Sequence, residues 1–462
     1  MPLRVLSAIL FSPRGGSAPV ARSLVRGLRA QGCEVTFVAG SRGDLGGHGD
    51  ARRFYGEVQA VEFDAALASP DPMRFEGPPG SAPMHPSFEE RLDAPDRVFA
   101  MLDDLDYERQ VRAWARELGR AGAAQADVLH LHHLTPINEA AARVAPHVPI
   151  VGQLHGTELL MLEQIADGPP AGWDHAQRWA DRLRGWAQSC SRLIVAPAGA
   201  ERASQLLDVP LERLIGMPNG VDVELFKPGS LDRYRFWQRT LVEDPRGWAP
   251  GQAAGSVRYT GDDVALLERA TVFVYVGRFT AVKRLDRLIA AFALAQRRAP
   301  GAAALVLVGG HPGEWEGEHP AQTVARLNVP AVFLAGWRSH EELPEFFVAS
   351  DAVISAAERE QFGQLLIEGM ACGLPAIGIR ALGPESIIED GSSGWLVAPS
   401  DEAALADTIA EVSESPRERE RRGRAARESV CERFSWSQMS AQLEGILADA
   451  AAQASHAPAV EA

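Results

Sequence analysis

The sequence predicts an α/β protein made of two doubly wound domains that face a cleft. Three observations predict it: short apolar runs alternate with stretches of helical period, the alternation pauses near the middle of the chain, and it then restarts. Near-continuous apolar runs are typical of parallel strands that helices cover on both faces. In such sheets, ligands collect beyond the carboxyl ends of the strands.

The first half opens with a strand, a helix and a second strand. These segments are RVLSAILF, SAPVARSLVRGLRAQG and CEVTFVAG, and they are typical of a βαβ unit. Three more strand candidates follow, DVLHLHHL, VPIVGQLHG and SRLIVAPA, with helical patterns over residues 107–120 and 173–189. We expect a first domain over residues 1–225.

The alternation pauses at MPNGVDVELFKPGS, where Asn219-Gly220 marks a turn, and an irregular stretch is expected over residues 229–270. It restarts with five strand candidates, TVFVYVGR, AALVLVGG, AVFLAGW, DAVISAA and LPAIGIR. Helical patterns such as residues 283–298 lie between them. We expect a second domain over residues 226–433.

Three further segments stand apart from these domains. Residues 69–97 carry seven prolines, so they cannot form a regular helix or a central strand and are expected to be a long loop. A lid or acceptor clamp and a surface excursion without catalytic meaning fit this composition equally. The mixed charges of residues 417–427 indicate a solvated helix face, and residues 456–462 are expected to be a disordered tail.

The composition limits the partners of the protein. The chain has 46 basic and 61 acidic side chains and a formal charge of −15, so its field repels nucleic acid and anionic membranes. An anionic ligand must therefore meet a local cationic pocket. No run approaches the roughly 18 to 20 apolar residues of a membrane span, and no signal-cleavage pattern follows the start. We expect a cytoplasmic protein without integral membrane association.

Two carboxylates frame the most informative stretch of the second half. Glu360 and Glu368 follow a strand candidate and lie eight residues apart. If a helix begins near Gly363, the amides of Gly363, Gln364 and Leu365 point into the cleft as an anion or hydroxyl site. Glu360 then lies just before the helix and Glu368 about two turns inside it. An isolated pair of this kind is more often a capping residue and an exposed helical residue.

Two cations make this pair more informative. Arg278 directly follows a strand candidate and Lys283 opens the next helix, so both lie at the edge where ligands collect. Lys283 is also one of only two lysines in the chain. Two cations and a helix N-terminus can neutralise a diphosphate without a metal.

Histidines gather at the ends of two neighbouring strand candidates of the first half. A lone histidine is more often structural, but His132, His133 and His155 at one sheet edge favour a site. Period-two alternation points His132 toward the cleft, whereas His130 is expected in the core. For His133 both interpretations stay open.

Two other patterns are not interpreted as sites. Asp104-Leu105-Asp106 has a spacing that can hold a divalent ion, but it lies in a polar helical run far from any strand end, so no metal site is expected. The glycines of residues 309–313 do not form GxGxxG, and GxxxxGK[ST] does not occur, which excludes nicotinamide and P-loop nucleotide sites.

The motifs of the second half resemble the carboxyl-terminal domain of the retaining GT-B glycosyltransferases of family 4. They are NGVDVELFKP, GRF with the lysine that follows, the two glutamates with FG between them, EGMACGLPAIG and FSW, within residues 217–440. The first half matches more loosely through Gly15-Gly16, DVLHLHH and His155-Gly156-Thr157. The resemblance implies two Rossmann-like domains, an acceptor-side first domain and a nucleotide-sugar-binding second domain. It also implies that residues 434–455 form a helix that crosses back to the first domain.

The resemblance further implies which residues hold the donor. Arg278 and Lys283 would bind its diphosphate, and Glu368 would hold the ribose hydroxyls. Gly15 and Gly16 would let the first loop approach the phosphates, because neither residue has a side chain. Arg338 is the candidate for base recognition. The backbone donors near the transferred sugar would be those of Phe362, Gly363, Gln364 and Leu365.

The transferred sugar and the acceptor would meet another set of residues. Glu360 would hold a hydroxyl of the transferred sugar, and His155 would touch that sugar near its reacting carbon. The expected catalytic residues are then Glu360, His155, Arg278 and Lys283. The expected acceptor-binding residues are His132, His133 and Thr157.

We therefore expect a hexosyltransferase-type enzyme (EC 2.4) that moves a sugar from a nucleotide-diphosphate sugar, UDP-sugar being favoured, to a hydroxyl of a small soluble acceptor. The expected acceptor is a secondary metabolite or a sugar phosphate. The anomeric configuration would be retained by a front-face path without a metal, and the nucleotide sugar is a co-substrate rather than a cofactor. Three alternatives stay open: a pseudo-glycosyltransferase that couples an activated cyclitol, a nucleotide-sugar hydrolase or epimerase, and a non-catalytic GT-B scaffold. A monomer or homodimer is expected.

Overall fold

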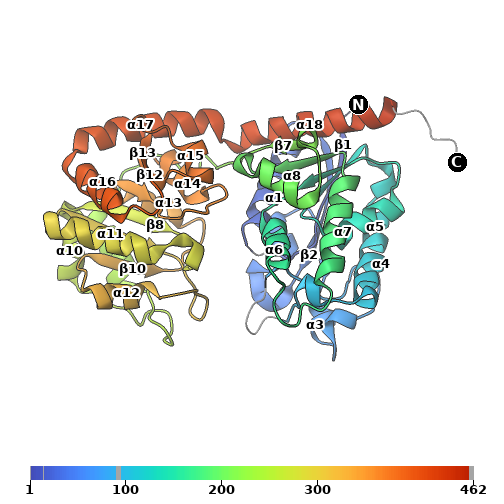
Figure 1. The fold of residues 1–462 in the computed structure, drawn as a ribbon, viewed down its shortest axis with the longest axis horizontal. Coiled ribbons are helices and arrows are strands. Elements are labelled where there is room, and N and C mark those ends of the chain that lie inside the picture. Colours follow the sequence, from blue (N-terminus) through green and yellow to red (C-terminus); the bar gives the residue numbers. More distant parts are fainter. Residues whose placement is uncertain (1, 14, 90–94, 457–462) are drawn as a thin grey trace. The chain divides into compact units, whose positions relative to one another are not determined.

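The computed structural model describes residues 2–13, 15–89 and 95–456 (Figure 1). Backbone contacts divide the chain into two compact units. The first unit contains the described residues up to Pro218 and those from Trp436 onward, and the second unit contains Asn219–Ser435. The chain thus passes between the units at residues 218/219 and 435/436, where the sequence predicted 225/226 and 433/434.

The first unit is built on a seven-stranded parallel sheet in the order β3-β2-β1-β4-β5-β6-β7. Its strands are β1 (Arg4–Ile9), β2 (Glu34–Ser41), β3 (Gln59–Glu62), β4 (Val128–His132), β5 (Ile150–Gln153), β6 (Arg192–Val195) and β7 (Leu214–Gly216). Its α-helices are α1 (Ser17–Ala30), α2 (Ala51–Tyr55), α3 (Asp64–Leu67), α4 (Asp104–Arg120), α5 (Pro136–Val144), α6 (Thr157–Ala166), α7 (Ala176–Ser189), α8 (Ala200–Leu207) and α18 (Trp436–His456).

The second unit is built on a six-stranded parallel sheet in the order β10-β9-β8-β11-β12-β13. Its strands are β8 (Thr271–Val276), β9 (Ala303–Val308), β10 (Val332–Gly336), β11 (Ala352–Ile354), β12 (Ala376–Ile379) and β13 (Gly394–Val397). Its α-helices are α9 (Arg233–Trp237), α10 (Gly261–Arg269), α11 (Leu285–Arg298), α12 (Pro320–Leu327), α13 (Leu343–Val348), α14 (Gln364–Ala371), α15 (Leu382–Ile387), α16 (Glu402–Glu414) and α17 (Pro416–Arg433).

The predicted doubly wound architecture is confirmed in both units. In each sheet the strand order reverses once, between β1 and β4 in the first unit and between β8 and β11 in the second. These reversals are the topological switch points, where the loops that follow two neighbouring strands diverge and leave room for a ligand. The loops after β1 and β4 carry Gly15 and His133, and the loops after β8 and β11 carry Arg278 and Glu360.

The C-terminal helix α18 belongs to the first unit and packs on α1 (Figure 1). Leu24 and Leu28 of α1 share one buried apolar cluster with Leu443 and Leu447 of α18. The two helices approach so closely that a Cβ atom added to Gly27 would lie 1.8 Å from the Ser440 hydroxyl oxygen. Of the expected disordered tail over 456–462, His456 ends α18, and the other residues lie outside the described part of the chain.

The described part of the proline-rich segment 69–97 is a loop, as predicted, with one 3₁₀ turn at Pro72–Arg74. Residues 81–88 of it are buried in the core of the first unit, whereas residues 69–80 are mostly exposed or partly exposed, so only part of the segment lies at the surface. The side chain of Gln110 donates to the carbonyl oxygen of Met84 at 2.7 Å, which ties the segment to α4. Residues 90–94 lie outside the described residues.

The expected irregular stretch over 229–270 is partly helical. It contains α9, a π-helical segment Gln238–Glu243 and α10. Asp232 caps α9, and the side chain of Thr260 begins α10 with a capping box. Trp237 and Trp248 from this stretch are buried in the core of the second unit, which explains why it folds against the sheet. No helix of the described residues is long and apolar enough to cross a bilayer.

Candidate active site

Lys283 and Glu360 meet at the switch point of the second unit. Lys283 ends a 3₁₀ turn (Ala281–Lys283) in the loop after β8, and Glu360 lies in the loop after β11. The ammonium group of Lys283 forms an ion pair with the carboxylate of Glu360, and their side chains are only 22% and 14% exposed. A largely buried pair of this kind is stronger than a surface ion pair, because water screens it less.

Arg278 lies in the same loop as Lys283, directly after Gly277 at the end of β8. The residue is exposed, and no hydrogen bond or ion pair joins its guanidinium to any residue that the structure describes. Its backbone is fixed instead, because the Tyr275 hydroxyl donates to the Arg278 carbonyl oxygen at 3.0 Å. The turn is tight: a Cβ atom added to Gly277 would lie 2.6 Å from the Tyr275 hydroxyl oxygen. A rigid backbone thus presents a free cation at the sheet edge.

Glu368 is the fifth residue of α14, which begins at Gln364 with Gly363 as its N-cap, close to the predicted helix start. Its side chain is 5% exposed, and its Oε1 lies 3.1 Å from Nε2 of His340, a contact that the sequence did not indicate. His340 follows β10, two residues after Arg338, so its place at the same sheet edge was the available signal.

The loop between Glu360 and α14 is held from two sides. The amide of Gly383 donates to the Glu360 carbonyl oxygen at 3.0 Å, and a Cβ atom at Gly383 would collide with the Phe362 backbone. Gly363 begins the helix at φ +108°, a left-handed conformation that favours glycine. The side chain of Gln364 donates to the Gly220 carbonyl oxygen at 3.0 Å, so it is committed within the second unit, whereas the amides of the first turn of a helix have no partner within the helix. The buried side chains of Phe362 and Leu365 anchor it in the core.

The structure does not support the predicted role of Arg338 in base recognition. Its guanidinium group is 2% exposed and donates to the carbonyl oxygens of Thr240 and Asp244 at 2.7 and 3.0 Å. A third bond reaches the Asp244 carboxylate at 3.1 Å. Arg338 therefore fixes the end of the π-helical segment to the sheet, and its donors are not free for a ligand.

The histidine cluster, defined as His130, His132, His133 and His155, lies at the carboxyl ends of β4 and β5 in the first unit. Nδ1 of His132 lies 3.1 Å from Nε2 of His155, and the rings of His133 and His155 are 4.4 Å apart. His130 lies deeper, as predicted, with its ring nitrogens 2.9 Å from Oε1 of Gln153 and 3.3 Å from the Ser7 hydroxyl.

Burial sets the charge of the cluster. It lowers the pKa of His130 to about 4 and the pKa values of His132 and His155 well below their ordinary range. Burial opposes ionisation of Glu158 as well, but the contact of its Oε1 with Nδ1 of His133, at 2.7 Å, holds the pKa of this carboxyl below its ordinary value. His155 is thus neutral at pH 7, and Glu158 is ionised.

The remaining predicted residues of the first unit lie at the same sheet edge. Gly16 caps α1, Gly15 has φ +73°, and a Cβ atom at either would meet nothing within 4 Å, so the loop is open there. Ile9 of β1 pairs with His132 of β4, which places this loop next to the histidine cluster. Thr157 begins α6, and its buried hydroxyl bonds to no residue within the described ranges.

Asp104 and Asp106 do not converge on one point. Asp104 forms ion pairs with Arg178 and Arg182, and Asp106 accepts from Arg74 and Arg109 at 3.1 and 3.0 Å. Both carboxylates are therefore committed to arginines at the N-terminus of α4.

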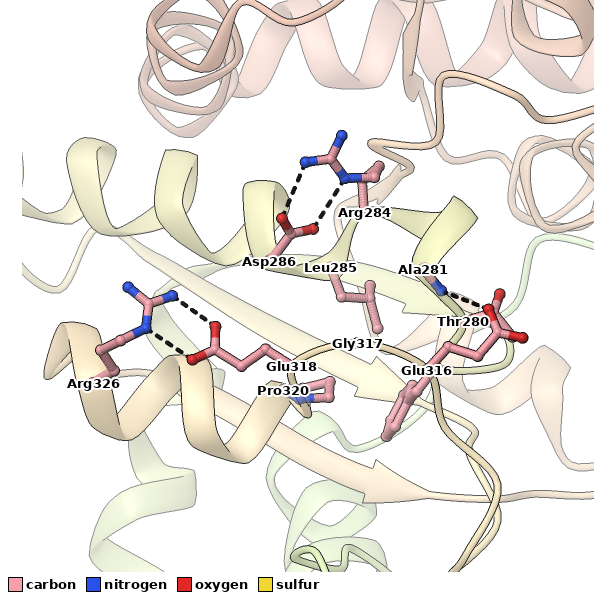
Figure 2. A pocket seen from close by; sticks show the side chains of 11 residues that line it. Thr280, Ala281, Arg284, Leu285, Asp286, Glu316, Gly317, Glu318, Pro320 and Arg326 are labelled. Atoms are coloured by element: carbon pink, nitrogen blue, oxygen red, sulfur yellow. Dashed lines mark hydrogen bonds and ion pairs between the residues drawn. The ribbon is translucent and has the colours of Figure 1, made fainter. Parts of the chain in front are cut away.

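A pocket of about 220 Å³ lies beside the turn that carries Lys283 (Figure 2). Its charged walls are paired: Arg284 with Asp286, and Arg326 with Glu318. Glu316 accepts from the Ala281 amide at 3.0 Å and so braces the turn. The charged side chains around this pocket thus pair with one another, and Glu316 stabilises the turn.

The chain matches two known glycosyltransferase families, one in each half. The family described as "Glycosyltransferase Family 4" matches residues 14–225, and the family described as "Glycosyl transferases group 1" matches residues 262–429. The chain belongs to the group 1 glycosyltransferases. The predicted resemblance is thereby confirmed, and the alternative of a non-catalytic scaffold is not supported.

This glycosyltransferase is similar in sequence to two kinds of enzyme, a transferase and a synthase. It is 27% identical to D-inositol 3-phosphate glycosyltransferase of Saccharomonospora viridis over 86% of each chain. It is 30% identical to N-acetyl-alpha-D-glucosaminyl L-malate synthase of Bacillus anthracis, over 40% of this chain and 48% of that relative.

Solved structures confirm the GT-B fold. The HepE protein of Anabaena, crystallised with UDP and glucose, superposes with a TM-score of 0.66 at 17% identity, over 97% of this chain and all of the other. Sucrose-phosphate synthase of Thermosynechococcus elongatus gives the same TM-score at 19% identity, over 98% of this chain and all of the other.

Proposed function

We propose that this glycosyltransferase moves a hexosyl group from a UDP-sugar to a hydroxyl of a small soluble acceptor, with retention of the anomeric configuration and without a metal. One observation carries the proposal: the loop after β8, at the switch point of the second unit, carries both Arg278, whose guanidinium bonds to none of the described residues, and Lys283, which forms an ion pair with Glu360. Two cations and a carboxylate at this place match a diphosphate that carries a sugar. The formal charge of −15 makes such a local cationic group necessary.

The donor would be held by the second unit. Arg278 and Lys283 bind its diphosphate, Glu368 with His340 behind it binds the ribose hydroxyls, and Glu360 binds a hydroxyl of the sugar. The amides at the start of α14 supply further contacts. The choice of uridine rests on HepE, which was crystallised with UDP and with UDP-glucose.

The transfer step would use the leaving group itself. The bond between the anomeric carbon and the diphosphate oxygen breaks, the bond to the acceptor oxygen forms on the same face, and the acceptor proton passes to the departing phosphate oxygen. Glu360 is assigned to a hydroxyl of the sugar, and no carboxylate is assigned as a nucleophile at the anomeric carbon, which favours this front-face path over a covalent intermediate. Arg278, Lys283 and the helix amides then stabilise the charge that develops on the diphosphate.

The first unit would serve the sugar and the acceptor. Nε2 of neutral His155 contacts Nδ1 of His132 at 3.1 Å, so Nδ1 is the ring nitrogen of His155 that would bind the transferred sugar. His132, His133 and Thr157 are assigned to the acceptor side. The names of the relatives, which refer to inositol 3-phosphate and to L-malate, support a small polar acceptor with a hydroxyl group.

Calorimetric titration with UDP, GDP, ADP and TDP sugars tests the donor, and product analysis tests the reaction. We expect UDP-sugars to bind most tightly and the product to keep the anomeric configuration of the donor. Nucleotide release that needs no acceptor would indicate a hydrolase or epimerase instead. A product without a glycosidic bond would indicate a pseudo-glycosyltransferase.

A further inference from the structure

Glu158 is a buried carboxylate that contacts the histidine cluster. It is the second residue of α6 and is fully buried. Its Oε1 lies 2.7 Å from Nδ1 of His133, and its Oε2 accepts from the backbone amide of His155 at 3.3 Å. A single carboxylate thus connects two of the four histidines.

The direction of the first contact follows from the charge. Because Glu158 is ionised, its oxygens only accept hydrogen bonds, so Nδ1 of His133 carries the proton. Burying a carboxylate is costly unless it is paired, and the helix N-terminus and His133 together supply that pairing. The carboxylate is therefore held in one place.

The backbone of His133 adopts a left-handed conformation at the same place. Its φ is +65°, in the left-handed region that non-glycine residues rarely adopt. Its amide still donates to the Gln153 carbonyl oxygen at 2.8 Å. The left-handed residue therefore lies directly after β4, where the chain turns away from the sheet. Strain of this kind is retained where the surrounding structure fixes it, and it gathers at functional positions.

Glu158 contacts His155 in two ways, directly through its backbone amide and indirectly through the ring of His133. Its backbone amide is bound by the carboxylate, and its ring packs at 4.4 Å against the ring that the carboxylate orients. His132 fixes Nε2 of the same ring. The imidazole of His155 thus contacts two neighbouring rings, and its backbone amide is bound by the carboxylate.

We propose that Glu158 is a positioning residue, which acts through His133 to fix the ring of His155 for sugar transfer. The inference rests on the proposed function, since it takes His155 as the group that meets the transferred sugar. Glu158 touches neither substrate in this proposal. Its loss would reduce turnover and leave binding of the nucleotide by the second unit unchanged.

Two substitutions in the full-length protein test this. Glu158→Gln keeps the size of the side chain but replaces one carboxylate oxygen with an amide nitrogen, which cannot accept a hydrogen bond. It therefore breaks the contact with either Nδ1 of His133 or the His155 amide. His133→Asn tolerates the left-handed backbone and keeps a donor near the position of Nδ1, but it removes the ring that packs on His155. Glu163→Gln is the matched control, because Glu163 lies on the same helix and pairs with Arg202.

Steady-state kinetics with a UDP-sugar and calorimetry with UDP form the first readout. We expect kcat to fall about 10-fold to 100-fold for both variants, with the Kd for UDP within twofold of the wild-type value, while Glu163→Gln matches the wild type in both. Values of kcat within twofold of the control for both variants would overturn the proposal. If Glu158→Gln does not fold, the imidazole ¹⁵N shifts of His155 in His133→Asn decide, because His133 is also assigned to the acceptor side and kcat alone does not separate the two roles.

Imidazole ¹⁵N shifts of histidine-labelled protein form the second readout and need no substrate. The His155 signals, assigned with a His155→Gln variant, are expected to indicate one fixed tautomer in the wild type and averaging in both variants. Unchanged His155 signals would overturn the proposal. If the wild type transfers no sugar, the proposed function fails, and the shifts alone decide the role of Glu158.

Discussion

The ammonium group of Lys283 forms an ion pair with the carboxylate of Glu360 across the switch point between β8 and β11. The cation assigned to the donor diphosphate is thus paired with the carboxylate assigned to the donor sugar. A diphosphate that binds Lys283 competes with Glu360, so donor binding exchanges one anionic partner of the lysine for another. The exchange would free Glu360 to bind a sugar hydroxyl only when the diphosphate is in place.

Lys283→Ala is expected to lower kcat/KM by about 10²-fold to 10³-fold, because it removes one donor to the charge that develops on the leaving diphosphate. Steady-state kinetics with a saturating acceptor measure this. Lys227→Ala is the matched control, because Lys227 is the only other lysine and its exposed ammonium group pairs with Glu224. Near-normal turnover of Lys283→Ala would show that the diphosphate is not held by this lysine.

Glu360→Gln is expected to lower kcat by about 10²-fold, since a neutral amide positions the sugar hydroxyl less well than a carboxylate. The affinity for UDP is expected to stay equal or to rise, because the lysine no longer has an anionic partner to exchange. Turnover assays and calorimetry on the same preparation measure both effects. An unchanged turnover removes Glu360 from the site.

Much of the fold could be predicted because the central strands are buried on both faces. TVFVYV and AALVLV became β8 and β9, and nearly every residue in them is buried. The short strands β3, β7 and β13 were missed, because three or four residues show no period. Arg278, Lys283 and Glu360 could be placed at one edge for the same reason, since the end of each strand fixes where the following loop begins.

The contacts of the site could not be predicted, because they join residues that are distant in sequence. His133 and Glu158 are 25 residues apart, and His340 and Glu368 are 28 apart, so the spacing indicates neither pair. The arginine run of α17 shows the same limit: Arg427 donates to the carbonyl oxygens of Val223, Phe226 and Ala371, which a mixed charge pattern does not reveal.

Activity is expected to survive an excess of EDTA. The proposed site neutralises the diphosphate with Arg278, Lys283 and helix amides, and the carboxylates of the DxD pattern are committed to arginines. Turnover is measured after dialysis against EDTA and again after addition of Mg²⁺ or Mn²⁺. A loss that either ion restores would contradict the metal-free mechanism, and Asp104→Asn would then show whether that carboxylate is a ligand.

The stability of the first unit is expected to fall as the pH drops from about 6.5 toward 4. Burial lowers the pKa of His130 to about 4, whereas an unfolded histidine titrates near 6.5. Below pH 6.5 the unfolded chain therefore binds a proton that the folded chain does not, which favours unfolding by up to about 3 kcal/mol.

Urea unfolding at pH 7 and pH 5 measures this slope. His130→Gln is expected to reduce the slope without abolishing it, because glutamine cannot take up the proton, whereas the buried His132 and His155 still gain protons on unfolding. His147→Gln, at an exposed histidine, is the control and should keep the wild-type slope. Equal slopes in all three proteins would show that His130 is not the group that links proton uptake to unfolding.

Arg338→Leu separates a structural role of this arginine from base recognition. The substitution leaves the carbonyl oxygens of Thr240 and Asp244 without a buried donor, so we expect a loss of about 3 kcal/mol of stability. The Kd for UDP should stay within twofold when it is measured well below the melting temperature. Arg235→Leu, at a largely exposed position, is the control for the loss of a surface charge. A variant of normal stability that binds UDP tenfold more weakly would instead place the Arg338 side chain against the base.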